Sequence, residues 1–510
     1  MHGILARAKE SLAMKIGIVF IGSISFGLID FIIRILMGKQ LSQSEYGLFS
    51  LSLAILNILV FIACLGLKEG VSRSIAYKKG LEGQSQIRDF IYSSLYLSII
   101  SSILVFLCLF FASDLVSKKI FHSPQLAPLL QILAFAIPPI VFIEIASSVF
   151  RGLGRVQERV YFRDFLMKGL QLSFVTWILF IHHSLIGAVG AYVASTILSS
   201  IFFAGYTSRK LRKLTPNING AKTKLPMVKE IFFFSLPLLV LSSLGLTMTW
   251  TDTLMLGYFT SPDKVGLYNG ATPVLQILQL IPASIVFIYV PLASEFIGRG
   301  HLAKVREIYK KLTKLGWLLS FPIFLTIFLF AKEVLLVFFG EGYTGAIMPL
   351  RILMVGYILV SLFGPVDFTL LSFGKTKFLL MNASIAALVN IVLNILLIPT
   401  IGIIGASLAT VTSWVVSCLL NFIFVYILTR IQPFDQNFLK PVIILSIFSL
   451  ASFFVLPKFI IDISSYYIML ISFLLFVIIT GLVIIYTQGL TKDILKILSF
   501  ALGSIGINKK

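Results

Sequence analysis

The composition of this 510-residue chain indicates a protein embedded in a lipid bilayer. Hydrophobic residues make up 58% of the chain and charged residues 12%, whereas a soluble domain has about 45–50% apolar and about 25% charged residues. A core surrounded by water cannot bury this much apolar side chain. The composition therefore excludes a soluble enzyme, a nucleic-acid-binding module and a protein with a single membrane anchor, despite the net charge of +21.

Fourteen apolar segments along the chain have the length needed to cross a membrane, about 20 residues or more. Backbone groups in lipid must form their hydrogen bonds within the segment, so each is predicted to be a helix. Pro138 and Pro139 lie inside the fourth segment and predict a bend there. The segments are residues 12–37, 46–67, 89–113, 126–149, 163–182, 186–206, 230–256, 266–293, 313–337, 349–373, 379–398, 404–428, 440–460 and 466–487.

The distribution of positive charge predicts the orientation of these helices. With the N-terminus in the cytoplasm, thirty-three of the 42 Lys and Arg residues fall on cytoplasmic segments and five on external segments. Basic residues concentrate on the cytoplasmic side of membrane helices. Both termini are therefore expected on the cytoplasmic side of the cell membrane, where the basic loops would contact anionic lipid headgroups.

Short motifs recur in order along the chain at offsets of 215 to 220 residues, which predicts a duplicated six-helix unit. Since six is an even number, both copies insert the same way up, and their pseudo-two-fold axis is expected to lie along the membrane normal. The matching pairs are Ser44–Phe49 with Asp263–Tyr268, Gln131–Leu133 with Arg351–Leu353, Leu153–Arg155 with Phe373–Lys375, and Ile186–Ala194 with Ile401–Ala409. The expected parts are an N-terminal lobe (12–206), a basic cytoplasmic linker (207–229), a C-terminal lobe (230–428), two extra transmembrane helices (440–487) and a cytoplasmic amphipathic tail (488–510).

Ionisable side chains inside the predicted spans are candidates for function, because a charge at the bilayer centre costs roughly 3 kcal/mol. Asp30 and Arg34 are four residues apart on one helix face and can neutralise each other. The topology places these two residues in the outer half of the membrane and Lys168 in the inner half. Structural ion pairs and side chains that snorkel to the interface remain the alternative reading. The candidates are Asp30, Glu144, Asp252 and Asp367 among the acids, and Arg34, Arg163, Lys168 and Arg351 among the bases.

Motifs of catalysis and of cofactor binding are missing from the sequence. There is no GxxxxGK[ST] phosphate loop, no His or Cys group with metal-ligand spacing and no activated nucleophile. The three cysteines lie in apolar segments and are expected to be packing residues. The sequence predicts a protein that is not an enzyme, needs no metal or cofactor, and draws its energy from an ion, voltage or substrate gradient.

The motifs resemble those of the flippases that move lipid-linked oligosaccharides for polysaccharides of the O-antigen and teichoic-acid type. These flippases belong to the multidrug/oligosaccharidyl-lipid/polysaccharide transporter superfamily, and the resemblance covers nearly the whole chain. Fourteen helices fit this branch better than the twelve-helix drug exporters. The motifs that carry the resemblance are Leu41–Ser50, Gly70–Ala76, Arg151–Arg155, Asp252–Phe259, Val265–Tyr268, Phe339–Tyr343 and Asn394–Thr410.

The resemblance implies two six-helix lobes, a cationic central cavity, alternating access and a substrate carried on a polyprenyl phosphate or pyrophosphate. On that basis the candidate substrate-binding cations are Arg34, Arg163, Lys168 and Arg351. The acids Asp30, Glu144, Asp252 and Asp367 become candidate sites for a coupling proton or sodium ion, or charge partners of these cations. Polysaccharide assembly proteins are candidate partners. The competing hypotheses are an ion-coupled multidrug exporter of the same superfamily, a membrane oligosaccharide polymerase or ligase, and a scaffold of the cell envelope.

Overall fold

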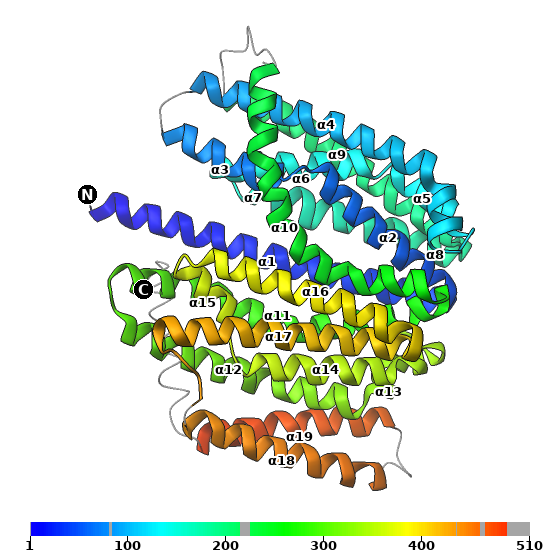
Figure 1. The fold of residues 1–510 in the computed structure, drawn as a ribbon, viewed down its shortest axis with the longest axis vertical. Coiled ribbons are helices and arrows are strands. Elements are labelled where there is room, and N and C mark those ends of the chain that lie inside the picture. Colours follow the sequence, from blue (N-terminus) through cyan, green and yellow to red (C-terminus); the bar gives the residue numbers. More distant parts are fainter. Residues whose placement is uncertain (1, 81–83, 215–224, 435, 460–464, 487–510) are drawn as a thin grey trace. The chain divides into compact units, whose positions relative to one another are not determined.

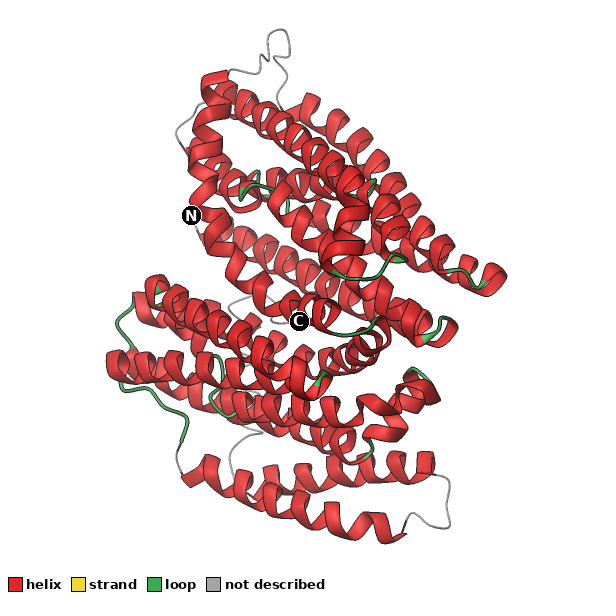
Figure 2. Ribbon diagram, turned by 45° about the vertical axis from the view of Figure 1, so that its right-hand side comes forward, coloured by secondary structure: helices red, strands yellow, loops and turns green. Residues whose placement is uncertain are grey.

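The computed structural model describes the chain except for residues 1, 81–83, 215–224, 435, 460–464 and 487–510. Every regular element among the described residues is a helix, as predicted (Figure 2). The predicted tail at 488–510 and the middle of the predicted linker lie outside the described residues. The helices are α1 (His2–Gln40), α2 (Gln43–Ala63), α3 (Leu67–Gly80), α4 (Gln84–Leu115), η1 (Val116–Ile120), α5 (Leu126–Ala134), α6 (Ile137–Gly152), α7 (Gln157–Arg159), η2 (Val160–Met167), α8 (Lys168–His182), α9 (Leu185–Leu214), α10 (Leu225–Phe259), α11 (Pro262–Gly298), α12 (Leu302–Leu329), α13 (Ala331–Phe338), η3 (Glu341–Ala346), α14 (Ile347–Ser361), α15 (Val366–Ser372), α16 (Thr376–Ile401), α17 (Ile403–Thr429), α18 (Gln436–Phe459) and α19 (Ser465–Tyr486).

The helices reproduce most of the predicted membrane spans. Within the described residues, ten helices are long and apolar enough to cross a membrane. The pair α5 and α6 makes an eleventh if it counts as one span, with a bend of 44° just before Pro138 and Pro139. The remaining three predicted segments correspond to α10, α18 and α19. Two predicted cytoplasmic links hold additional helix, since α3 fills most of 68–88 and α12 begins at Leu302.

The chain forms two compact units. The N-terminal unit is Lys15–Asn269, and the C-terminal unit is Gly270–Lys510 together with Met1–Met14. Helix α10 belongs to the N-terminal unit, where it packs against α2, α3 and α4. The lobes expected from the sequence repeat describe duplication rather than packing, so their boundaries remain a prediction.

Two repeat-equivalent glycines allow a close helix contact in the N-terminal unit. A Cβ on Gly47 would lie 1.8 Å from the carbonyl oxygen of Pro262, and a Cβ on Gly266 would lie 2.1 Å from that of Gln43. Each glycine also faces the backbone nitrogen of the other. The starts of α2 and α11 therefore meet backbone to backbone, and no other residue type fits at either position.

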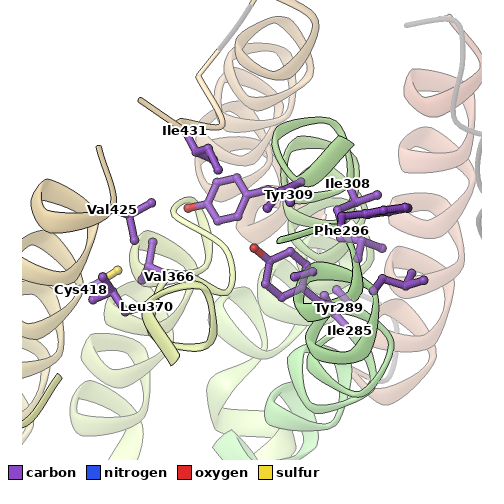
Figure 3. Packing of buried hydrophobic residues seen from close by; sticks show 14 residues of the cluster. Ile285, Tyr289, Phe296, Ile308, Tyr309, Val366, Leu370, Cys418, Val425 and Ile431 are labelled. Atoms are coloured by element: carbon purple, nitrogen blue, oxygen red, sulfur yellow. The ribbon is translucent and has the colours of Figure 1, made fainter. Parts of the chain in front are cut away.

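The core of the C-terminal unit is built from α11, α12, α15 and α17 (Figure 3). Two buried tyrosines in this core hold the break between α14 and α15. The hydroxyl of Tyr289 lies 2.7 Å from that of Thr369, and the hydroxyl of Tyr309 donates to the carbonyl of Phe363. Antiparallel α16 and α17 form a hairpin turned at Gly402, while α18 and α19 lie side by side (Figure 1).

Candidate functional site

Asp30 on α1 lies between two cations. The Arg34 Nε donates to Asp30 Oδ2 at 2.8 Å, and the Lys168 Nζ donates to Asp30 Oδ1 at 2.6 Å. The Asp30–Arg34 pair is the one that the four-residue spacing predicted. The contact with Lys168 joins charges that were expected in opposite halves of the membrane, and their depth in the bilayer stays a prediction. The helical stretch that carries Lys168 begins at Gln157, six residues before the predicted span.

A second ion pair group centres on Glu144 of α6. The Arg163 Nε lies 2.7 Å from Glu144 Oε1, and the Lys68 Nζ lies 3.0 Å from Glu144 Oε2. Arg163 is contributed by η2 and Lys68 by α3. The Glu144 side chain is 12% exposed, so this carboxylate is shielded from solvent by the cations that neutralise it.

An aromatic ring joins these two groups. The centroid of the Phe26 ring on α1 lies 4.6 Å from the Lys168 Nζ and 5.1 Å from the Arg163 guanidinium carbon. Both distances fall within the range of a cation–π interaction. Phe26 precedes Asp30 by one helical turn, so α1 meets the two cations through a ring and a carboxylate on one face.

A third carboxylate, Asp164, is buried with looser partners. Its side chain is 1% exposed, and its nearest cations are the Arg163 Nη1 at 3.8 Å and the Arg159 Nε at 3.9 Å. Neither Asp164 oxygen accepts a hydrogen bond from a described residue. Gly22 on α1 makes room chiefly for Val160, since a Cβ there would lie 2.5 Å from Val160 Cγ1 and 3.2 Å from Asp164 Oδ2.

We call these eight residues the charge cluster. It holds five cations and three carboxylates, and its excess of two positive charges corresponds to Lys68 and Arg159, whose side chains are 43% and 34% exposed. An excess of positive charge attracts an anionic ligand. Its members are Asp30, Arg34, Lys68, Glu144, Arg159, Arg163, Asp164 and Lys168.

Three other predicted candidates lie outside the charge cluster. The Arg351 Nε donates to the carbonyl of Phe328 at 3.0 Å and its Nη2 to that of Leu329 at 3.4 Å. These carbonyls end α12, so Arg351 caps that helix and interacts favourably with its dipole. Asp252 is buried and accepts a hydrogen bond of 2.6 Å from the Tyr268 hydroxyl.

Asp367, the fourth predicted acid, lies in the C-terminal unit beside a pocket of about 160 Å³ lined mainly by apolar side chains. The Asn421 Nδ2 donates to Asp367 Oδ1 at 2.6 Å, and the Asn382 Nδ2 donates to the Asn421 oxygen at 2.6 Å. No basic side chain pairs with Asp367 among the described residues. This carboxylate therefore belongs to an amide network and not to an ion pair.

Sequence reasoning missed four members of the site: Phe26, Lys68, Arg159 and Asp164. Phe26 is one phenylalanine among 46 and carries no signal of its own. Lys68 and Arg159 lie in segments assigned to the basic cytoplasmic surface. One signal was available, since Arg151, Arg155, Arg159 and Arg163 recur every four residues and lead from the α6–α7 link into the membrane.

Comparison with solved structures shows which fold this is. The lipid II flippase MurJ in an inward closed conformation matches with a TM-score of 0.74 at 14% identity, over 91% of this chain and 98% of that chain. An inward-facing multidrug resistance MATE family transporter of the MOP superfamily matches with a TM-score of 0.67 at 17% identity, over 79% and 94%. The chain has the two-lobe fold of this superfamily, as predicted.

Curated relatives match most of their own length. The chain is 24% identical to the probable low-salt glycan biosynthesis flippase Agl15 of Haloferax volcanii, over 81% of this chain and 82% of the relative. It is 24% identical to the stage V sporulation protein B of Bacillus subtilis, over 77% and 79%. The uncharacterized membrane protein MJ1068 of Methanocaldococcus jannaschii is 23% identical, over 83% and 85%.

Two family profiles match the sequence. The MatE profile matches residues 237–396, in line with membership of the wider superfamily. The polysaccharide biosynthesis protein profile matches residues 12–297, which is more than half of the chain. This span contains the whole charge cluster. The chain therefore belongs to the polysaccharide biosynthesis protein family.

Proposed function

We propose that this protein moves a lipid-linked oligosaccharide across the cytoplasmic membrane by alternating access, for the synthesis of a cell-surface polysaccharide. The substrate class is a polar oligosaccharide attached to a polyprenyl phosphate or pyrophosphate. The observation that carries the proposal is the charge cluster, which gathers five Lys and Arg side chains around three carboxylates in a family member. The names of the relatives Agl15 and MurJ support the same substrate class.

The physical problem that such a protein solves is the transfer of sugar hydroxyls through hydrocarbon. Each hydroxyl that enters an apolar environment without a hydrogen-bond partner costs about 4–8 kcal/mol relative to water. A path lined by polar side chains removes this cost, while the isoprenoid chain stays in lipid. The phosphate carries negative charge, and Arg163 and Lys168 can hold it through charge-assisted hydrogen bonds.

The sign of the cluster favours this proposal over export of cationic drugs. A cationic drug would be attracted by unpaired carboxylates, whereas every carboxylate of the charge cluster lies within 4 Å of two cations. Asp367 is a different case, because it accepts a hydrogen bond from Asn421 and no basic side chain within the described part of the chain pairs with it. We therefore propose Asp367 as the candidate site for a coupling proton or sodium ion, separate from the substrate phosphate.

The test of the proposed function is translocation in proteoliposomes. A fluorescent lipid-linked oligosaccharide is placed in both leaflets, and an impermeant lectin or quencher reports the fraction that reaches the outer face. The wild-type protein is expected to speed this movement over protein-free liposomes. A rate equal to that of protein-free liposomes would contradict the proposed function.

Variants then connect the activity with the cluster. Arg163→Gln and Lys168→Gln are expected to slow translocation about tenfold or more, since a hydrogen bond to a charged group contributes about 1.5–3 kcal/mol. Lys118→Gln is the matched control, because Lys118 forms an exposed ion pair with Asp114 outside the cluster. Equal rates for all three variants would separate the activity from the charge cluster.

A further inference from the structure

We infer that Phe26 and the π-helical turn η2 form a cradle for one phosphate group, in which Arg163 and Lys168 are the ligands and Phe26 is a positioning residue. The inference rests on the proposed function and deepens it, because it names the atoms that meet the anionic part of the substrate. Three features carry it: the hydrogen-bond pattern of η2, the ring contacts of Phe26 and the donors that the two cations present.

The π-helical turn explains why the two cations share one side. In an α-helix, residues three and four apart are neighbours, whereas residues five apart point in different directions. The hydrogen bonds of η2 instead span five residues. Arg163 and Lys168 are five apart, and so are Arg159 and Asp164, which approach to 3.9 Å. The unusual turn thus brings Arg159 close to Asp164, and it leaves Arg163 and Lys168 both beside the Phe26 ring. Such turns occur frequently at functional sites.

Phe26 attracts both cations without neutralising either. The face of a phenyl ring is a region of negative potential, and a cation above it gains about 0.5–2 kcal/mol. The ring lies 4.6 Å from the Lys168 nitrogen and 5.1 Å from the Arg163 guanidinium. A carboxylate in this place would remove a positive charge from the cluster. The phenyl ring keeps both charges and holds them near one point.

The remaining donors suit a phosphate. Lys168 has three N–H donors and Arg163 has five. Among the described residues, Lys168 gives one hydrogen bond to Asp30, Arg163 is held by Glu144 at its Nε, and the Arg163 Nη1 lies 3.8 Å from Asp164. The ammonium and the Arg163 Nη2 can therefore bind phosphate oxygens while the carboxylates keep the two side chains oriented. A neutral lipid alcohol offers no charge to this pair.

The experiment measures binding of farnesyl pyrophosphate and of farnesol to the purified full chain in detergent. Phenylalanine 26 is replaced with ring-fluorinated phenylalanines carrying one, two or three fluorine atoms, which withdraw electron density from the ring face at nearly constant volume. Pyrophosphate affinity is expected to fall at each step, and Phe26→Leu to lower it between about 2- and 30-fold. Phe26→Tyr is expected to keep most of the affinity, and farnesol binding is expected to stay constant throughout the series.

Phe111→Leu is the control, because Phe111 is 77% exposed on α4 and lies against another phenylalanine ring. The cradle is overturned if wild-type protein does not bind the pyrophosphate, if the fluorinated series keeps wild-type affinity, or if farnesol affinity falls in parallel. The series decides even if Phe26→Leu does not fold, since fluorination preserves packing. If the protein translocates substrate but fluorination does not change pyrophosphate affinity, the cradle alone is contradicted. If pyrophosphate affinity falls along the fluorinated series but the protein does not translocate substrate, the proposed function alone is contradicted.

Discussion

Asp30 illustrates how a membrane protein stabilises charge inside its fold. The carboxylate accepts hydrogen bonds from Arg34 and Lys168 at once. The Asp30 side chain is 24% exposed, that of Arg34 12% and that of Lys168 6%. Two cations paired with one carboxylate give this group a net charge of +1. Such an arrangement is costly to assemble, because desolvation opposes it, but removal of one partner costs more than removal of the whole group.

We therefore expect Asp30→Asn to lower the free energy of unfolding by about 3 kcal/mol, because it leaves two buried cations with only a neutral amide. The double variant Asp30→Asn/Lys168→Met is expected to recover part of this loss. Thermal unfolding of the purified protein in detergent measures both. If Asp30→Asn and Lys168→Met lower the free energy of unfolding additively in the double variant, the two residues are not coupled.

The amide network at Asp367 predicts a contrasting result. Asp367→Asn keeps an oxygen that accepts from the Asn421 Nδ2, so the free energy of unfolding is expected to change by less than about 1 kcal/mol. Asn421→Leu removes that donor and also the acceptor of Asn382, and is expected to cost about 2–3 kcal/mol. Denaturation of both variants side by side tests this. Equal losses would mean that the carboxylate charge itself stabilises the fold.

At the scale of helices, the close approach of α2 and α11 depends on residues with no side chain. Gly47 and Gly266 let carbonyl groups of the opposite helix lie where a Cβ would be. Small residues are common where membrane helices pack together. Lipid provides no hydrophobic force between helices, so van der Waals contact between closely approaching backbones must hold them. Ser42 and Glu45 fix the start of α2 beside this contact through a reciprocal capping box.

Gly47→Ala is expected to lower the free energy of unfolding by about 3 kcal/mol, because the new methyl group would meet a backbone oxygen that cannot rotate away. Gly205→Ala is the matched comparison on α9, where a Cβ meets no atom within 4 Å. This second variant is expected to be more stable than wild type by about 0.5–1 kcal/mol, as alanine is the better helix former. Destabilisation of the same size at both positions would assign the effect to glycine flexibility and not to the contact.

For the molecule as a whole, the asymmetry of Lys and Arg predicts which loops reach each compartment. In a variant without the three native cysteines, Ser261→Cys between α10 and α11 is expected to react with an impermeant maleimide on intact cells. Arg299→Cys between α11 and α12 is expected to react only after the membrane is opened; both side chains are exposed. The reverse pattern of labelling would invert the proposed topology.

The helical type of the spans and the position of most of them could be predicted from the sequence, because bilayer thickness sets a minimum apolar length that a soluble helix does not need. The bend at Pro138 and the pair Asp30–Arg34 followed from local chemistry in the same way. Helix α3 could not be predicted from apolar length because it is polar, and in the structure it packs against α4, α6 and α10. The contact between Lys168 and Asp30 spans 138 residues, and the π-helical turn that accompanies it has no sequence period of its own.

The meeting of Gly47 with Gly266 bears on how this chain came to have two copies of one motif. The glycines are 219 positions apart, and each occupies the same place in its own copy. In a single-copy ancestor that assembled as a symmetric pair, one glycine would have faced itself across the dyad. Fusion of two genes would then have preserved an ancient dimer contact as a contact within one chain. A larger residue in either copy would break this helix contact.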